Sequence, residues 1–144
     1  QREIEILGSA GRLHDVGKLA IPDSILTKPT PLSVEEYEVI KRHPRVGVDM
    51  TKFVLNSREA ISLVRNHHER PDGKGYPDGL SGKEIPMLTR ILSVADVYDA
   101  LTSDRPYRHA FPHSKAIKIL VEQSGTQLDE EVVAAFCECH RIPD

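Results

Sequence analysis

Hydrophobic residues recur at helical spacing along most of the chain. In the first segment Ile4, Leu7 and Leu13 fall on one face of a helix, which we expect to end near residues 14–16. Gly17 follows directly and is placed to end this helix in a left-handed conformation. The opening pattern therefore predicts a helix that packs one apolar face against a core.

Similar periodicity predicts further helices, joined by segments rich in proline and glycine. They are expected at residues 33–43, 46–54, 57–68, 87–103, 114–124 and 129–139. Ser33 and Glu36 have the spacing of a capping box, and Pro44 is expected to end the helix that they begin. Residues 20–32 contain three prolines and leave room only for a single helical turn at residues 23–26.

Composition favours a purely helical core. Tryptophan is absent and aromatic residues make up 5% of the chain, so Leu, Ile, Val and Ala must fill the interior. With 144 residues the chain is long enough for one core and too short for two. We therefore expect residues 1–144 to form a single all-α domain, a compact bundle of about six to seven helices.

Charge and cysteine content argue against several classes of protein. The 19 Lys and Arg residues and 22 Asp and Glu residues give a net charge of −3, which offers no general attraction to a nucleic-acid duplex. No apolar run approaches the ~20 residues of a membrane span. Cys137 and Cys139 are too few and too close in sequence to staple a secreted domain, so the expected compartment is the reducing cytoplasm.

Imidazole and carboxylate groups occur at several predicted helix ends and on one helix face. They are His14, Asp15, His43, His67, His68 and Asp96, with Lys18 close behind Asp15. Without a thiolate among them, such donors suit Fe, Mn or Zn in a reactive centre rather than a structural zinc site. Neighbouring helical residues point about 100° apart, so His67 and His68 are expected to face different ions, with Asp15 bridging the pair.

Each of these residues alone has an ordinary structural explanation. A His-Asp pair can close a helix, and His67 with His68 can interact with a helix dipole. Their joint occurrence on separate elements favours a two-metal site. No site is assigned to three other groups. Cys137, Cys139 and His140 do not share a helix face. We expect His109 and His113 to be solvated side chains, and Lys41, Arg42 and Arg45 to form a solvated helix end.

The segment from residue 69 to residue 86 is too irregular for a periodic element. It holds four glycines and three prolines among charged residues, and it directly follows His67 and His68. The glycines permit positive φ angles and close backbone approach, and Tyr76 offers a flat ring and a hydroxyl group. We expect an ordered binding loop, although a glycine-rich surface loop would show the same composition.

Motifs cover nearly the whole chain. The most specific is His-His-Glu-x-x-Asp-Gly-x-Gly-Tyr-Pro at residues 67–77. The others lie at residues 13–18, 21–22, 28–29, 42–44, 79–80, 85–86, 95–102 and 105–107. Together they resemble the HD-GYP subgroup of the HD metal-dependent phosphohydrolases.

The resemblance implies an HD-type helical bundle that hydrolyses cyclic di-GMP to linear pGpG, and in some members to GMP. Catalysis would use a hydroxide bridging two divalent transition metals, or three in some members, with Fe or Mn favoured over Zn. The metal ligands would be His14, Asp15, His43, His67, His68 and Asp96. The catalytic residues would be Asp15 and Lys18, and the substrate-binding residues would be Gly75, Tyr76, Pro77, Asp99, Arg105 and Arg108.

The chain departs from the family pattern before His14. Family members have one or two helices there, one of which supplies a further histidine ligand, whereas none of residues 1–13 is histidine. We therefore expect an HD-GYP domain that lacks its N-terminal helix or helices and binds metal more weakly. Gln127 and Leu128 also stand where the family commonly has His-Phe.

The resemblance also implies partners for this domain. We expect a cyclic dinucleotide substrate, sensory or receiver domains in a longer parent chain, and protein docking through the Gly-Tyr-Pro loop. No nucleic-acid duplex and no membrane segment is expected for this chain. Two other functions stay open from the sequence: a generic HD nucleotide phosphohydrolase, and a non-catalytic module that senses a cyclic dinucleotide or docks a partner.

Overall fold

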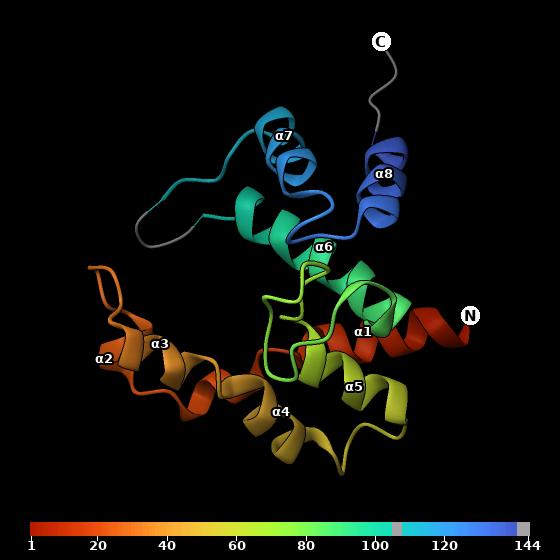
Figure 1. Ribbon diagram of the computed structural model, residues 1–144. Helices are drawn as coiled ribbons and strands as arrows, with labels where there is room; N and C mark the ends of the chain where they lie inside the picture. The colour runs from red at the N-terminus through yellow and green to blue at the C-terminus, as the bar shows by residue number, and fades with distance from the viewer. Residues whose placement is uncertain (105–107, 141–144) are drawn as a thin grey trace.

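Figure 1 shows the computed structural model of the chain, in which residues 1–104 and 108–140 are described. Its α-helices are α1 (Arg2–Leu13), α2 (Asp23–Leu26), α3 (Val34–Ile40), α4 (His43–Thr51), α5 (Arg58–Asn66), α6 (Met87–Thr102), α7 (His113–Gln123) and α8 (Glu130–Cys139). Two 3-10 helices, η1 (Val16–Ala20) and η2 (Gly82–Glu84), complete the regular elements of this part. The all-α prediction is confirmed, and α2 is the single turn expected between the prolines.

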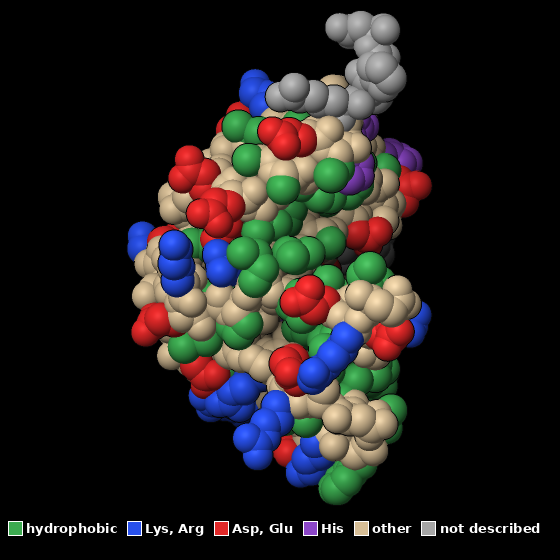
Figure 2. All heavy atoms as spheres, turned by 90° about the vertical axis from the view of Figure 1, so that its right-hand side faces the viewer, with side chains coloured by type: hydrophobic (Ala, Val, Ile, Leu, Met, Phe, Trp, Pro, Cys, Tyr) green, Lys and Arg blue, Asp and Glu red, His purple; other side chains and the backbone are tan. Residues whose placement is uncertain are grey.

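Helix α6 runs through the middle of the molecule. In Figure 1, α1 and α5 lie on one side of it and α7 and α8 on the other, while α4 packs against η1 and α5. None of the described helices has the length and apolar content that a bilayer crossing requires. Figure 2 shows one face of the molecule, on which acidic and basic side chains are intermingled around exposed hydrophobic atoms.

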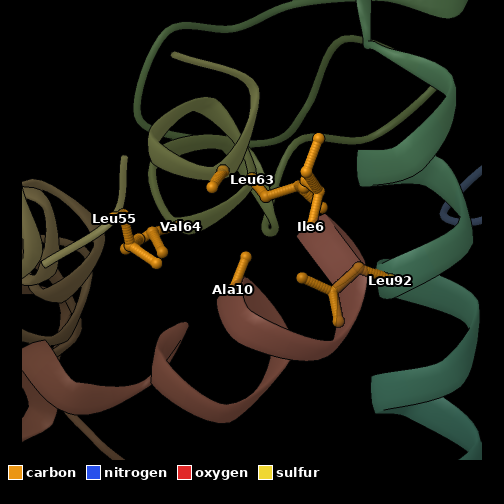
Figure 3. Close-up of a cluster of buried hydrophobic side chains, with 7 residues drawn as sticks. Ile6, Ala10, Leu55, Leu63, Val64 and Leu92 are labelled. Carbon is orange, nitrogen blue, oxygen red and sulfur yellow. The ribbon is translucent and has the colours of Figure 1, made fainter. Parts of the chain in front are cut away.

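Two hydrophobic clusters share α6. The first lies between α1, α5 and α6 (Figure 3) and consists of Ile6, Ala10, Leu55, Ala60, Leu63, Val64 and Leu92. The second packs α7 and α8 onto α6 and consists of Val94, Leu120, Leu128 and Val133. Because Leu92 and Val94 belong to different clusters, burial of apolar surface on both sides fixes the position of α6.

Capping side chains begin three helices as the sequence predicted. Ser33 accepts a hydrogen bond from the amide of Glu36, and the Glu36 carboxylate accepts one from the amide of Ser33, which completes the capping box of α3. Ser57 and Asp129 each accept a hydrogen bond from a first-turn amide of α5 and α8. These local signals set where the helices start.

The prediction that Pro44 ends a helix is wrong. Helix α3 already ends at Ile40, and Pro44 lies in the first turn of α4, which begins at His43 and ends at Thr51. Proline fits this position because a first-turn amide has no intrahelical acceptor and the fixed φ suits the helix. His43 is therefore the first residue of one helix rather than the last residue of another.

Gly17 does not end α1 in a left-handed conformation, so this prediction is also wrong. Helix α1 ends at Leu13, and Gly17 lies buried inside η1 without a positive φ. A Cβ atom at this position would lie 2.6 Å from the nitrogen of Gly47 and 2.9 Å from the carbonyl carbon of His43. Glycine is required here because η1 and α4 touch backbone to backbone.

Candidate metal centre

Six side chains that the sequence singled out come together beside α6. They are His14 and Asp15 between α1 and η1, His43 at the start of α4, His67 and His68 after α5, and Asp96 within α6. His43 and His67 are buried, and the other four are partly exposed. Four separate helix ends and one helix face thus supply a single cluster.

Two groups of potential metal ligands share Asp15. One consists of Asp15, His43, His67 and His68 and the other of His14, Asp15 and Asp96, and within each group the ligand atoms lie within 4.8 Å of one another. Oδ1 of Asp15 lies 3.3 Å from Nε2 of His43, and Oδ2 lies 3.5 Å from Nε2 of His14. The two carboxylate oxygens therefore face different groups, as a bridging ligand would.

His67 and His68 belong to the same group, contrary to the prediction that they face different ions. Helix α5 ends at Asn66, and His67 and His68 lie in the turn that follows. Their ring centroids lie 4.1 Å apart. The spacing of residues along a regular helix therefore does not predict which of these ligands converge.

A backbone carbonyl orients each of three histidine rings. The Nδ1 atoms of His14, His43 and His67 lie 2.7, 2.7 and 2.8 Å from the carbonyl oxygen three residues earlier. A carbonyl oxygen can only accept a hydrogen bond, so Nδ1 carries the proton and the lone pair of each neutral ring is on Nε2. Each Nε2 atom is thereby prepared to bind a metal.

The arrangement of these acceptors fits a bound cation. Nε2 of His43 and Nε2 of His67 lie 3.2 Å apart, although each is an acceptor in its neutral ring. Nε2 of His14 and Oδ1 of Asp15 are buried without a hydrogen-bond partner among the described residues. Converging lone pairs repel one another unless a cation or a proton lies between them. Imidazole nitrogen and carboxylate oxygen are donors that divalent transition metals accept.

The surroundings keep three of these ligands in the protonation states that bind metal. Burial lowers the pKa of His67, and burial together with the His67 and His43 rings lowers the pKa of His68 to about 3. Burial alone would raise the pKa of Asp15, but the adjoining His43 and His67 rings and the Lys18 ammonium hold it well below its usual range. Two neutral imidazoles and an ionised carboxylate therefore meet at neutral pH. His14 differs, because burial would lower its pKa but the hydrogen bonds to Asp96 and to the carbonyl oxygen of Gly11 raise it.

Lys18 places a cationic group at the edge of the cluster. Its Nζ atom lies 2.6 Å from Oδ2 of Asp15, and its side chain is 34% exposed. The 3-10 helix η1, which follows Asp15 directly, brings Lys18 back beside that carboxylate. An ammonium group at this partly open position can stabilise negative charge on a bound anion.

Glu69 anchors the loop that follows the two histidines. Its buried carboxylate accepts hydrogen bonds from the amides of residues 78, 79 and 80, at 2.6, 3.1 and 2.9 Å. Three donors on one carboxylate hold the loop against the end of α5. The sequence analysis missed this role, for which the only signal was a lone acidic residue directly after His68.

The Gly-Tyr-Pro segment packs against the same histidines. A Cβ atom on Gly75 would lie 2.5 Å from Cα of Glu69 and 2.6 Å from the carbonyl oxygen of His68, so only glycine fits. The ring centroid of Tyr76 lies 4.9 Å from that of His68, and the Tyr76–Pro77 peptide bond is cis. Burial raises the pKa of Tyr76, so its hydroxyl group stays protonated.

The remaining predicted substrate residues are not part of the two ligand groups. Asp99 is exposed on α6, one turn after Asp96. Arg108 donates hydrogen bonds to carbonyl oxygens in the last turn of α6, and its guanidinium lies over the ring of Phe111 at 4.2 Å from the centroid. Arg105 lies outside the described residues. Their contact with a substrate stays a prediction.

The histidines of two groups to which no site was assigned, His109 with His113 and His140 beside the cysteines, are not among these ligand groups. His109 is exposed as expected, whereas the expectation that His113 is simply solvated is wrong, because its Nδ1 atom lies 2.8 Å from the hydroxyl group of Tyr98. His140 stacks on Phe136, with ring centroids 4.1 Å apart. These contacts give the two histidines a structural role beside α8.

Comparison with known proteins decides the family. The HD-domain pattern matches residues 3–132 of this chain. The chain belongs to the HD-domain family. The solved structure of Bd1817, described as an HDG"Y"P protein from Bdellovibrio bacteriovorus, superimposes on 96% of this chain and 44% of that chain, with a TM-score of 0.72 at 22% identity. These findings confirm the family expected from the motifs and its fold.

Several curated relatives of this HD domain are longer proteins. The cyclic di-GMP phosphodiesterase response regulator RpfG of Xanthomonas campestris is 45% identical over 94% of this chain and 36% of its own length. The 3'3'-cGAMP-specific phosphodiesterase 3 of Vibrio cholerae is 39% identical over 96% of this chain and 30% of its own length. The chain therefore spans about a third of the length of the relatives that it matches.

Proposed function

We propose that this HD domain is a metal-dependent phosphodiesterase that hydrolyses cyclic di-GMP to linear pGpG. The supporting observation is Asp15, which belongs to two groups of potential metal ligands and turns one carboxylate oxygen toward each. Centres that hydrolyse phosphodiesters hold two ions about 3.5–4 Å apart, a spacing that one bridging carboxylate can span. The relatives named above as cyclic dinucleotide phosphodiesterases support the substrate class.

The six clustered side chains would hold two divalent transition metals. His43, His67 and His68 would serve one metal, His14 and Asp96 the other, and Asp15 both. Imidazole and carboxylate donors accept Fe, Mn or Zn, and the resemblance to the HD-GYP subgroup favours Fe or Mn. When bound, such metals polarise a phosphoryl oxygen and lower the pKa of water, which supplies a nucleophile at neutral pH.

The chain's own residues would bind and orient the substrate. The Lys18 ammonium would stabilise negative charge on the reacting phosphate, and the Tyr76 ring would support a base or ribose beside His68. Glu69 would keep Gly75, Tyr76 and Pro77 in place through its bonds to the loop. Asp99, Arg105 and Arg108 are the remaining proposed substrate contacts.

Product analysis tests this proposal. The chain, loaded with Mn(II) or Fe(II), is incubated with cyclic di-GMP and separately with 3'3'-cGAMP, and chromatography detects the linear dinucleotide. We expect linear pGpG from cyclic di-GMP, none from D15A or H67A, and the wild-type amount from K118A, whose side chain is exposed on α7. Nucleotide that binds the metal-loaded protein without turnover would contradict an enzyme and indicate a sensor, and faster release of phosphate from mononucleotides would indicate a generic phosphohydrolase.

A further inference from the structure

A basic pocket adjoins the candidate metal centre, and its cationic side chains have no part in the chemistry above. Its volume is about 330 Å³. It is lined by Glu38, Lys41 and Arg42 from the end of α3 and the turn that follows, by Arg45 from α4, and by Tyr76 and Pro77 from the loop. Residues 41, 42 and 45 are the basic cluster that the sequence assigned to a solvated helix end, and the structure instead places them around a pocket.

The charge of this pocket favours an anion. Three cationic side chains and one acidic side chain line it, and the single acid, Glu38, is paired with Lys41. Arg45 donates a hydrogen bond to the carbonyl oxygen of Pro77 at 3.1 Å, and its charge also acts on the Asp78 carboxylate, which is itself paired with Arg65. The Arg42 side chain is exposed and has no hydrogen bond or ion pair within the described residues.

A single aromatic ring connects the pocket to the metal-ligand cluster. Tyr76 lines the pocket, and its ring centroid lies 4.9 Å from that of His68 and 6.4 Å from that of His43. Arg42 directly precedes His43 in the chain. An anion in the pocket and an anion at the cluster would therefore be neighbours on either side of Tyr76.

We propose that Arg42, with Lys41 and Arg45, binds the second, non-reacting phosphate of a cyclic dinucleotide; this proposal rests on the proposed function. A cyclic dinucleotide carries two phosphodiester groups, and only one can be cleaved at the cluster in a given turnover. The other needs a counter-charge close by, and Arg42 offers an unpaired guanidinium, the group best suited to phosphate oxygens. The subsite would thus favour doubly charged cyclic substrates over esters with one phosphate.

Charge reversal at Arg42 tests the subsite. R42E should raise both the KM and the dissociation constant for cyclic di-GMP about tenfold and leave kcat within about twofold, because the lost contact holds ground state and transition state equally. R42K should retain most of the affinity. R58E is the matched control, since Arg58 is also exposed and carries the same charge at the start of α5, away from this pocket.

The outcomes separate the two proposals. If the wild type turns over cyclic di-GMP, and R42E and R58E have equal KM values and equal dissociation constants for it, the subsite proposal is overturned. The proposed phosphodiesterase activity would not be affected by that result. Absence of turnover in the metal-loaded wild type would overturn the phosphodiesterase, and the dissociation constants of cyclic di-GMP for R42E and R58E would then decide whether the pocket binds the nucleotide. A fall in kcat at unchanged KM in R42E would also contradict the subsite.

Discussion

At the scale of single residues, the absence of a Cβ atom at Gly17 allows two ligand-bearing elements of the candidate centre to lie close together. Gly17 lies in η1 between the ligand Asp15 and the helix that begins at His43. Because glycine has no side chain, the backbones of η1 and α4 can touch. The atoms that a Cβ atom would meet are all backbone atoms, which cannot rotate away as a flexible side chain could. The distance between two ligand-bearing elements is thereby set by a residue that binds nothing.

Substitution of this glycine should therefore harm stability and metal binding together. We expect G17A to lower the free energy of unfolding by about 2 kcal/mol, because overpacking forces η1 away from α4. Metal affinity should fall as well, since Asp15 and His43 lie on the separated elements. Urea denaturation and metal titration measure the two effects.

The control for this prediction is a glycine with free space. Gly8 lies on the exposed face of α1, and a Cβ atom there would meet nothing within 4 Å. G8A should stabilise the protein by about 0.5–1 kcal/mol, because alanine is the better helix former. Equal effects of the two substitutions would contradict the role given to Gly17.

A buried carboxylate makes a second residue-scale prediction. E69Q removes the charge that binds three amides of residues 78–80 and turns an amide donor toward them, so we expect a loss of about 2 kcal/mol. Hydrogen exchange at those amides should accelerate, and limited proteolysis should cut the loop. E138Q, at an exposed position of α8, should change neither. Unaltered exchange at residues 78–80 in E69Q would contradict the anchoring role.

At the scale of elements, one ion pair ties α6 to the start of α8. Asp129 caps α8 and lies 2.9 Å from Arg90 of α6, and both side chains are nearly buried. Burial opposes ionisation of Asp129, but the bonds from Arg90 and from the cap amide prevail and lower its pKa. The carboxylate therefore stabilises the packing of these two helices only while it is ionised.

This ion pair should make stability depend on pH. A carboxyl group whose pKa is lower in the folded than in the unfolded state stabilises the fold at neutral pH, and that contribution is lost as the pH falls from the unfolded value through the lowered folded value. D129N should therefore be less stable than the wild type by about 2 kcal/mol at pH 7, and the difference should shrink toward zero at low pH. Urea midpoints at pH 7 and pH 3 measure it. A constant difference would show that the charge is not responsible.

The helices also show which features of the fold could be predicted from the sequence and which could not. Helix starts such as Ser33 and Ser57 could be predicted because a cap is a contact within four residues. The grouping of His67 with His68 could not, because it depends on how their rings meet Asp15 and His43, which lie on other elements. The role of Gly17 was beyond reach for another reason, since it arises from packing between elements that only the folded chain brings together.

At the scale of the whole molecule, α6 links two hydrophobic cores, and the helices around these cores supply unequal numbers of ligands to the candidate centre. Among the described residues of the cluster, five of six ligands lie on α1, α4, α5 or directly after them, and only Asp96 lies on α6. Helices α7 and α8 contribute no ligand to it. Loosening of the second core should therefore reach the centre mainly through the position of α6, since its one other approach within the described part of the chain is Leu128, which lines a pocket together with His67, His68 and Asp96.

A cavity in the second core tests this separation. L120A removes a fully buried side chain of α7 and should lower the free energy of unfolding by about 3 kcal/mol. Metal affinity should fall much less than in G17A, and hydrogen exchange should accelerate mainly in α7 and α8. The matched variant L63A removes a buried side chain of α5 from the first core, and it should lower both the free energy of unfolding and the metal affinity. Equal losses of metal affinity in the two variants would contradict the separation.

The carbonyl oxygens that orient His14, His43 and His67 belong to the main chain. A substitution at residue 11, 40 or 64 changes the side chain and leaves the carbonyl oxygen in place. The tautomers of the three rings are therefore maintained by any sequence that preserves these helix ends. While these three histidines are retained, a change in metal preference would then have to arise at His68, at the carboxylates or at Lys18, whose orientation does not depend on such a carbonyl.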